Sequence, residues 1–147
     1  MGLDAAVYRR LEELSFTEKD LSSITVDPKT GQVDFEDPAL FRIWRDKIKA
    51  VEKRIGNSSF VNLLKTEIEE LLGHSTAEML LISKVLYSGT HSGDMISKHD
   101  LDYLRREIGL IRGIAGSHGS PELGNFLADM EELVVASEKH RNPIVFI

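Results

Sequence analysis

The sequence contains no cysteine and only 4 prolines, and aromatic residues make up 7% of its 147 positions. Without cysteine the chain has no disulfide framework, no thiolate zinc site and no thiol nucleophile. No apolar run approaches the ~20 residues that a membrane span needs, and the N-terminal segment lacks the apolar core of a signal peptide. We therefore expect one cytoplasmic domain over residues 1–147 with no membrane partner.

The charge balance is acidic, with 24 Asp and Glu against 18 Lys and Arg and a net charge of −6. An acidic chain argues against a general nucleic-acid binder and favours a basic partner. Acidic side chains gather around Glu69 and Glu70 and again between Asp129 and Glu138. Such faces can steer a basic protein toward its binding site, so we expect Glu69 and Glu70 to be partner contacts.

Apolar spacing of three and four residues predicts helices along most of the chain. The expected helices cover residues 3–14, 38–55, 60–72, 75–86, 97–115 and 120–134. Asp37-Pro38 and Ser120-Pro121 are helix-start signals, and Thr17 to Asp20 has the spacing of a capping box. The helix at 75–86 is apolar nearly all round, which predicts a central position in the fold.

Two segments have β character instead. Residues 24–35 alternate apolar and polar side chains around a turn containing Pro28 and Gly31, which predicts a hairpin. The apolar tail 144–147 follows Asn142-Pro143 and is expected to be a buried strand or packed tail, with the hairpin as a candidate partner. The predicted fold class is therefore mainly α: a single-domain bundle of five or six helices with a small β-hairpin.

Functional residue types are densest between residues 88 and 102. His91, Asp94 and His99 could supply nitrogen and carboxylate ligands to a metal ion in a small hydrolase, but their spacing matches no standard ligand signature. Gly89 and Gly93 precede a helix without the Lys-Ser/Thr ending of a phosphate-binding loop. Serine, histidine and aspartate are all present, yet no nucleophile motif surrounds them. We therefore expect no cofactor, no metal and no catalytic residue, and an exposed contact loop.

A basic stretch offers a third interpretation. Residues 42–54 carry six Lys and Arg against one Asp and one Glu, on a segment predicted to be helical. A basic helix can enter a DNA groove and neutralise phosphates. The same pattern is typical of the solvated face of an amphipathic helix, and no helix-turn-helix spacing follows it. Nucleic acid is therefore not an expected partner.

Two strings resemble a known class of proteins. The first is LYSGTHSGDMI from Leu86 to Ile96, and the second is FLADMEELV from Phe126 to Val134, followed by NPIVF at Asn142 to Phe146. Together they are similar to small bacterial immunity proteins of polymorphic or contact-dependent toxin systems. The resemblance covers roughly residues 78–147. It implies a cytoplasmic protein that binds a cognate toxin domain and blocks its active site or its assembly, and it carries no catalytic residues.

The sequence thus favours a protein-binding module over an enzyme, with a toxin domain as the expected partner and a homo-oligomer left open. The residues expected to contact the partner are His91, Ser92, Asp94, Glu69 and Glu70. A small metal-dependent hydrolase that uses the cluster at 88–102 is the alternative.

Overall fold

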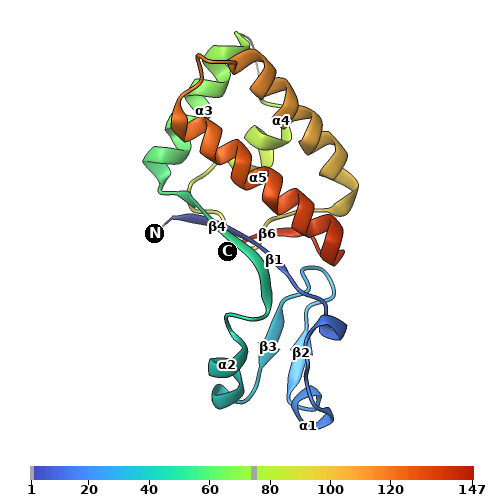
Figure 1. The fold of residues 1–147 in the computed structure, drawn as a ribbon. Coiled ribbons are helices and arrows are strands. Elements are labelled where there is room, and N and C mark those ends of the chain that lie inside the picture. The colour runs from blue at the N-terminus through green and yellow to red at the C-terminus, as the bar shows by residue number, and fades with distance from the viewer. Residues whose placement is uncertain (1, 74–75) are drawn as a thin grey trace.

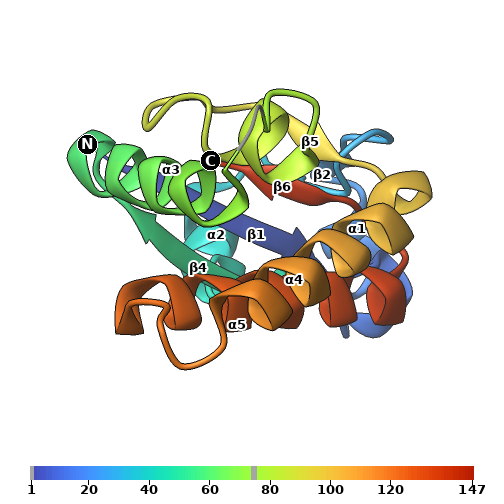
Figure 2. The same cartoon turned by 90° about the horizontal axis from the view of Figure 1, so that it is seen from above.

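The computed structural model describes residues 2–73 and 76–147 and has an α+β fold. Its centre is a four-stranded antiparallel sheet in the order β4 (Lys49–Gly56), β1 (Leu3–Tyr8), β6 (Ile144–Phe146) and β5 (Met95–Ile96). One face of this sheet is covered by α3 (Ser58–Leu72), α4 (Leu101–Ala115) and α5 (Pro121–His140) (Figures 1 and 2). The predicted mainly-α bundle is wrong, because segments from the start, middle and end of the chain pair as strands.

The N-terminal segment, expected to be a helix over 3–14, is the inner strand β1. Leu3, Ala5 and Val7 belong to the core under the helices, while Tyr8 belongs to a second apolar cluster on the other face. A strand covered on both faces is apolar at consecutive positions, so it lacks the alternation that marks a half-buried strand. Only one 3-10 turn, η1 (Leu11–Glu13), remains of the predicted helix.

The predicted basic helix over 42–54 is also wrong. The helix α2 (Pro38–Trp44) ends early, and the chain continues as strand β4, which pairs with β1. Ile48, Val51 and Ile55 have helical spacing, but their β-branched side chains suit a strand, and pairing with β1 decides the outcome. The basic residues of this stretch therefore lie at the end of a short helix, in the turn after it and on both faces of a strand, so no single basic helix is available to enter a DNA groove.

The hairpin expected over 24–35 is confirmed as β2 (Ile24–Val26) and β3 (Val33–Phe35), with Gly31 at a φ of 78° in the connecting loop. Together with η1, α1 (Glu18–Leu21) and α2 it forms a unit that we call the hairpin lobe, residues 11–47. Figure 1 shows this lobe on the face of the sheet opposite the three long helices.

The C-terminal tail is a strand, as expected, but it does not pair with the hairpin. β6 lies between β1 and β5, with Ala5 opposite Phe146 and Ile96 opposite Ile144. Ile144, Val145 and Phe146 are all buried, which explains why the last residues are apolar. The sheet therefore includes the last strand of the chain, which follows α5 in sequence and lies between β1 and β5.

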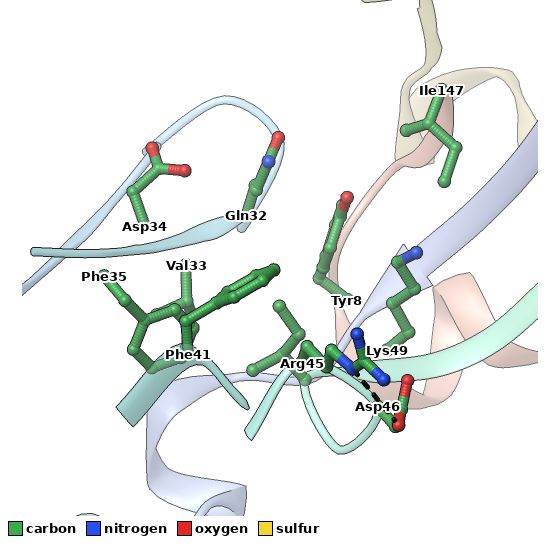
Figure 3. Close-up of a pocket in the computed structure, with 11 residues that line it drawn as sticks. Tyr8, Gln32, Val33, Asp34, Phe35, Phe41, Arg45, Asp46, Lys49 and Ile147 are labelled. Atoms are coloured by element: carbon green, nitrogen blue, oxygen red, sulfur yellow. Dashed lines mark ion pairs between the residues drawn. The ribbon is translucent and has the colours of Figure 1, made fainter. Parts of the chain in front are cut away.

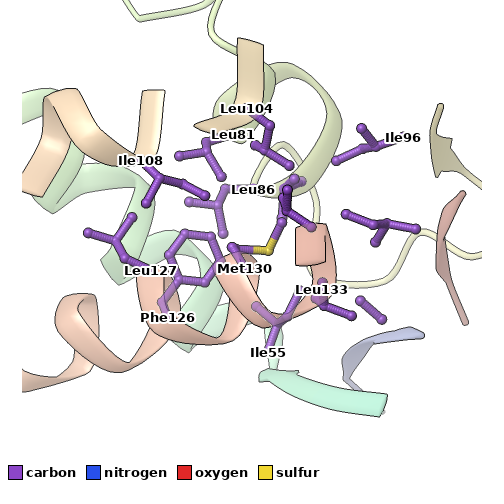
Figure 4. Close-up of a cluster of buried hydrophobic side chains, with 14 of the residues drawn as sticks. Ile55, Leu81, Leu86, Ile96, Leu104, Ile108, Phe126, Leu127, Met130 and Leu133 are labelled. Atoms are coloured by element: carbon purple, nitrogen blue, oxygen red, sulfur yellow. The ribbon is translucent and has the colours of Figure 1, made fainter. Parts of the chain in front are cut away.

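The main core lies between the sheet and the helices (Figure 4). The buried side chains labelled there include Ile55 from β4, Leu104 and Ile108 from α4, and Phe126 and Met130 from α5. These helices follow the predicted apolar stripes, and α3 begins and ends close to its predicted bounds. A smaller second cluster of Tyr8, Val33, Ile48 and Val145 joins the other sheet face to the hairpin lobe.

Helix starts are partly as predicted. Thr17 forms its capping box with Asp20, and Ser120 accepts a hydrogen bond from the N–H of Leu123. Ser97, the first residue of the helix expected over 97–115, makes no such bond, and a 3-10 turn, η3 (Lys98–Asp100), precedes α4.

The helix expected at 75–86 begins at Ser75, which lies outside the described residues. What is described there is the short π-helical segment η2 (Leu81–Val85). The carboxylate of Glu107 on α4 accepts hydrogen bonds from the N–H groups of Leu80 and Leu81 at 2.8 and 3.0 Å. Its two oxygens satisfy donors that are otherwise orphaned at a helix start.

Two side chains from the end of α5 fix the hairpin lobe to the sheet. His140 is buried and its Nδ1 lies 2.5 Å from the carboxylate of Glu13 in η1. The Asn142 amide donates to the carbonyl of Tyr8 at 2.8 Å and also lies against Gly31 in the hairpin loop. The position of the lobe relative to the sheet is therefore set by specific polar contacts as well as by apolar packing.

Candidate functional site

The structure brings together His91 and Asp94 of the predicted contact loop. His91 Nε2 lies 2.8 Å from the carbonyl oxygen of Val85, and its Nδ1 lies 3.1 Å from Asp94 Oδ2. The imidazole stacks on Tyr87 with ring centroids 4.4 Å apart and lies 4.8 Å from the ring of Phe146. The loop is thus built around the histidine ring, which packs against Tyr87 and Phe146 and is hydrogen-bonded through Nε2, while Nδ1 lies near Asp94 without a hydrogen bond.

This arrangement explains what His91 does. A carbonyl oxygen only accepts hydrogen bonds, so Nε2 carries a hydrogen and donates a hydrogen bond to the carbonyl of Val85. Only 6% of the side chain is exposed, and Nδ1 faces Asp94. Neither ring nitrogen is directed at solvent, so in this structure His91 positions the loop, and its role as a partner contact stays a prediction.

Asp94 has a second neighbour in the loop. The Tyr87 hydroxyl donates a hydrogen bond to the Asp94 carboxylate. This bond, followed by burial and by the negative charge of Asp94, raises the pKa of Tyr87 above its ordinary value. Tyr87 and Asp94 are both exposed, so they remain available as surface contacts.

Of the other predicted site residues, only Ser92 belongs to this loop. Ser92 is exposed in the same loop, whereas Glu69 and Glu70 are exposed near the far end of α3. Gly89 packs against Ser58 at the start of α3, and the rise of a helix puts Glu69 and Glu70 about 17 Å further along. The two groups of predicted contacts do not form one continuous patch.

The metal-site interpretation needed His91, Asp94 and His99 at a common point. His99 is exposed in η3, while His91 is turned into the protein. Among residues 2–73 and 76–147 the structure has no group of three or more His, Asp or Glu side chains that could hold a metal ion.

Sequence reasoning missed a cleft between the hairpin lobe and the sheet face opposite the three long helices, which we call the lobe cleft (Figure 3). It has a volume of about 570 Å³. Its walls come from β1, the hairpin, α2 and the start of β4, and the last residue of the chain lies at its edge. The lining residues are Tyr8, Gln32, Val33, Asp34, Phe35, Phe41, Arg45, Asp46, Ile48, Lys49 and Ile147.

Aromatic side chains build the lobe side of the cleft. Phe41, which is 46% exposed, meets the ring of Phe35 edge-on at 6.0 Å. Behind them Phe16 lies 6.1 Å from Phe35 and 4.3 Å from Trp44. These contacts anchor α2 to the hairpin, and they present Phe41 at the mouth of the cleft on a supported backbone.

The charges around the cleft are mixed. Arg45 Nε lies 3.7 Å from Asp46, and Lys49 Nζ lies 3.1 Å from Glu52, so both cations are near carboxylates. Burial raises the pKa of Tyr8, and the charges of Glu52 and Asp34 raise it further. Apolar walls with separated charges of both signs suit a polypeptide better than a highly charged polyanion.

The cleft has no local sequence signature because its walls come from four separate segments. Tyr8 and Ile147 are 139 positions apart, and the apolar spacing in the β4 segment predicts a helix, which would direct Lys49 elsewhere. The available signal was the presence of Phe16, Phe35, Phe41 and Trp44 within a short interval of a chain with few aromatics.

None of the helices described is long and apolar enough to cross a membrane. Comparisons of the chain with models of known protein families, with curated proteins and with solved structures find no match.

Proposed function

We propose that this protein is a binding module for another protein and that the lobe cleft receives the partner. The observation that carries the proposal is the pairing of an exposed aromatic side chain, Phe41, with an exposed Arg45 at the mouth of the cleft. Aromatic residues and arginine are enriched at protein interfaces and dominate their binding energy. They lie here on an ordered helix end, which reduces the entropic cost of association.

The hairpin lobe also exposes apolar side chains outside the cleft lining. Ile43 on α2 is 59% exposed and Leu21 on α1 is 44% exposed, although both belong to the small hairpin lobe. Exposed apolar side chains also occur on α3, α4 and α5, so Ile43 and Leu21 extend the proposed contact surface onto the lobe without defining it.

The partner class comes from the resemblance. The protein acts in the bacterial cytoplasm as an immunity protein, and its partner is a cognate toxin domain with a basic surface. A net charge of −6 favours association with such a domain. The strings that carry the resemblance lie around β5, α5 and β6, where many residues are buried, so the resemblance concerns the core more than the cleft.

The test compares two matched double variants in affinity capture from the native host, followed by native mass spectrometry. Phe41→Ala with Arg45→Ala removes the cleft pair. Tyr103→Ala with Arg106→Ala removes an exposed aromatic and arginine pair from α4, where the guanidinium lies 5.8 Å from the ring centre. We expect the wild type and the α4 variant to retain a polypeptide of defined stoichiometry and the cleft variant to lose it.

The captured polypeptide then tests the toxin assignment. Its expression alone is expected to arrest growth, and co-expression of the wild-type protein, but not of the cleft variant, is expected to restore growth. Equal capture by both double variants would remove the cleft from the interface. A partner whose expression is harmless would refute the immunity role while leaving the binding module intact.

A further inference from the structure

The strand β4 forms one edge of the sheet. It pairs with β1 on one side, and among the described residues no strand pairs with its other side. Its eight residues, Lys49–Gly56, therefore present a row of backbone N–H and C=O groups without a partner strand. Such an edge is a template for pairing with another strand.

The central part of this edge is regular. The register with β1 shifts between Leu3 and Asp4 and again between Val7 and Tyr8, which leaves Ile55 and Ala50 as extra residues on β4. Between these two bulges the pairing is continuous from Val51 to Arg54. Because bulges disrupt a ladder, this stretch is the segment that can accept a new strand.

We propose that β4 pairs antiparallel with β4 of a second copy of this chain, with the two-fold axis at Lys53. Two four-stranded sheets then become one continuous sheet, and the dimer buries the β4 edge of each copy, while the β5 edges stay at the two ends. An axis normal to the sheet keeps each face on the same side in both copies. Residues directly opposite each other must therefore face the same way, so the axis passes through a residue and not between two.

Charge selects the residue on the axis. With Lys53 there, Glu52 lies opposite Arg54 of the second copy, and symmetry repeats this attractive pair. An axis at Glu52 would place two glutamates opposite each other, and an axis at Arg54 would place two arginines there. Opposite charges across a strand pair stabilise the pair, and like charges destabilise it.

Glu52 and Arg54 lie where this pairing requires them. Glu52 and Arg54 share the sheet face opposite the helices, since they pair with Ala6 and Asp4 of β1. Both are exposed. Glu52 has an ion pair with Lys49 at 3.1 Å, whereas Arg54, although opposite Asp4 in the register, makes no ion pair within 4 Å with a described carboxylate. A glutamate from the second copy would supply one.

The lysine on the axis does not oppose pairing. Lys53 Nζ lies 2.6 Å from Glu132 and 3.6 Å from Asp129, both on α5. Its charge is therefore neutralised within its own chain before a second Lys53 approaches.

An apolar groove runs beside the edge and completes the surface. It has a volume of about 630 Å³ and lies between β4 and α5, with Val51, Ala128, Val135 and Ala136 among its lining residues. Val135 is 53% exposed. Because α5 lies along β4 (Figure 2), strand pairing brings the two α5 helices next to each other, and Val135 is then covered.

Charge reversal tests this pairing by sedimentation equilibrium at micromolar protein concentration. The wild type is expected to sediment at twice the 16.5 kDa chain mass. Glu52→Arg or Arg54→Glu turns both symmetric attractions into repulsions and is expected to weaken the dimer by at least about tenfold. The double variant Glu52→Arg with Arg54→Glu restores both pairs and is expected to dimerise within about threefold of the wild type.

Glu36→Arg reverses an exposed charge at the hairpin and serves as the control, with circular dichroism confirming that each variant is folded. A wild type that sediments as a monomer would overturn the proposal. So would a dimer that the single reversals leave unchanged, or one that the double variant does not regain. The lobe cleft plays no part in this test, so its result is independent of the proposed function.

Discussion

Replacement of His91 by alanine tests whether this side chain stabilises the fold by holding the loop. The variant removes the donor to the Val85 carbonyl at 2.8 Å, and an unpaired buried carbonyl costs about 1–3 kcal/mol. It also removes the ring that stacks on Tyr87 and contacts Phe146, which adds about 1–2 kcal/mol. We expect His91→Ala to lower the free energy of unfolding by about 3 kcal/mol and the melting temperature by roughly 6–12 °C.

Urea denaturation and thermal melts followed by circular dichroism measure this effect, with Ser92→Ala as the control. Ser92 is exposed in the same loop, so its replacement is expected to change stability by no more than about 0.5 kcal/mol. If His91→Ala melts within a degree of the wild type (about 0.5 kcal/mol or less), the histidine does not hold the loop, and its assignment as a positioning residue fails.

Two further predictions concern the hairpin loop and alkaline pH. Gly31→Ala forces a side chain into a φ of 78° and places its Cβ about 2.5 Å from the Asn142 amide, whereas Gly93→Ala meets only the backbone strain at a φ of 85°. In thermal melts Gly31→Ala is therefore expected to be less stable than Gly93→Ala by at least about 1 kcal/mol, and equal melting would refute the packing role of Gly31. The raised pKa of Tyr87 means that its bond to Asp94 stabilises the fold fully below pH 10.0 and is lost as the pH rises through the folded-state pKa. Asp94→Asn is expected to move the tyrosinate absorbance transition back toward 10.0, and an unchanged titration would contradict the hydrogen bond.

Local signals in the sequence were sufficient for several elements. Gly31 between alternating residues located the hairpin, and apolar stripes located α3, α4 and α5. In each case the signal comes from residues close in sequence or from the regular spacing of apolar residues along a helix. Asp37-Pro38 and Ser120-Pro121 likewise act within a single turn.

The sheet could not be found in this way. β1 is covered on both faces, so its apolar run hides the two-residue period, and in β4 the apolar spacing coincides with that of a helix. The partners of β1 are about 50 residues away in β4 and at the far end of the chain in β6. Pairing across such separations is a tertiary effect that no local window contains.

Only the local part of the candidate site could be predicted from the sequence. His91 and Asp94 were identified because they are three residues apart in one loop, and the structure brings them together. The burial of His91 could not be predicted, because it depends on Phe146 from the C-terminal strand β6. The lobe cleft needs β1, the hairpin, α2 and the C-terminal residue at once, so only the fold reveals it.

The most direct test of the central claim is hydrogen–deuterium exchange of the isolated protein and of its complex with the captured partner. Our account predicts that binding protects β3, α2 and the start of β4, which carry Phe35, Phe41 and Lys49 of the lobe cleft. Protection confined to the loop with Ser92 and Asp94, or to the α3 segment with Glu69 and Glu70, would contradict it and would return the interface to the residues first expected from the sequence.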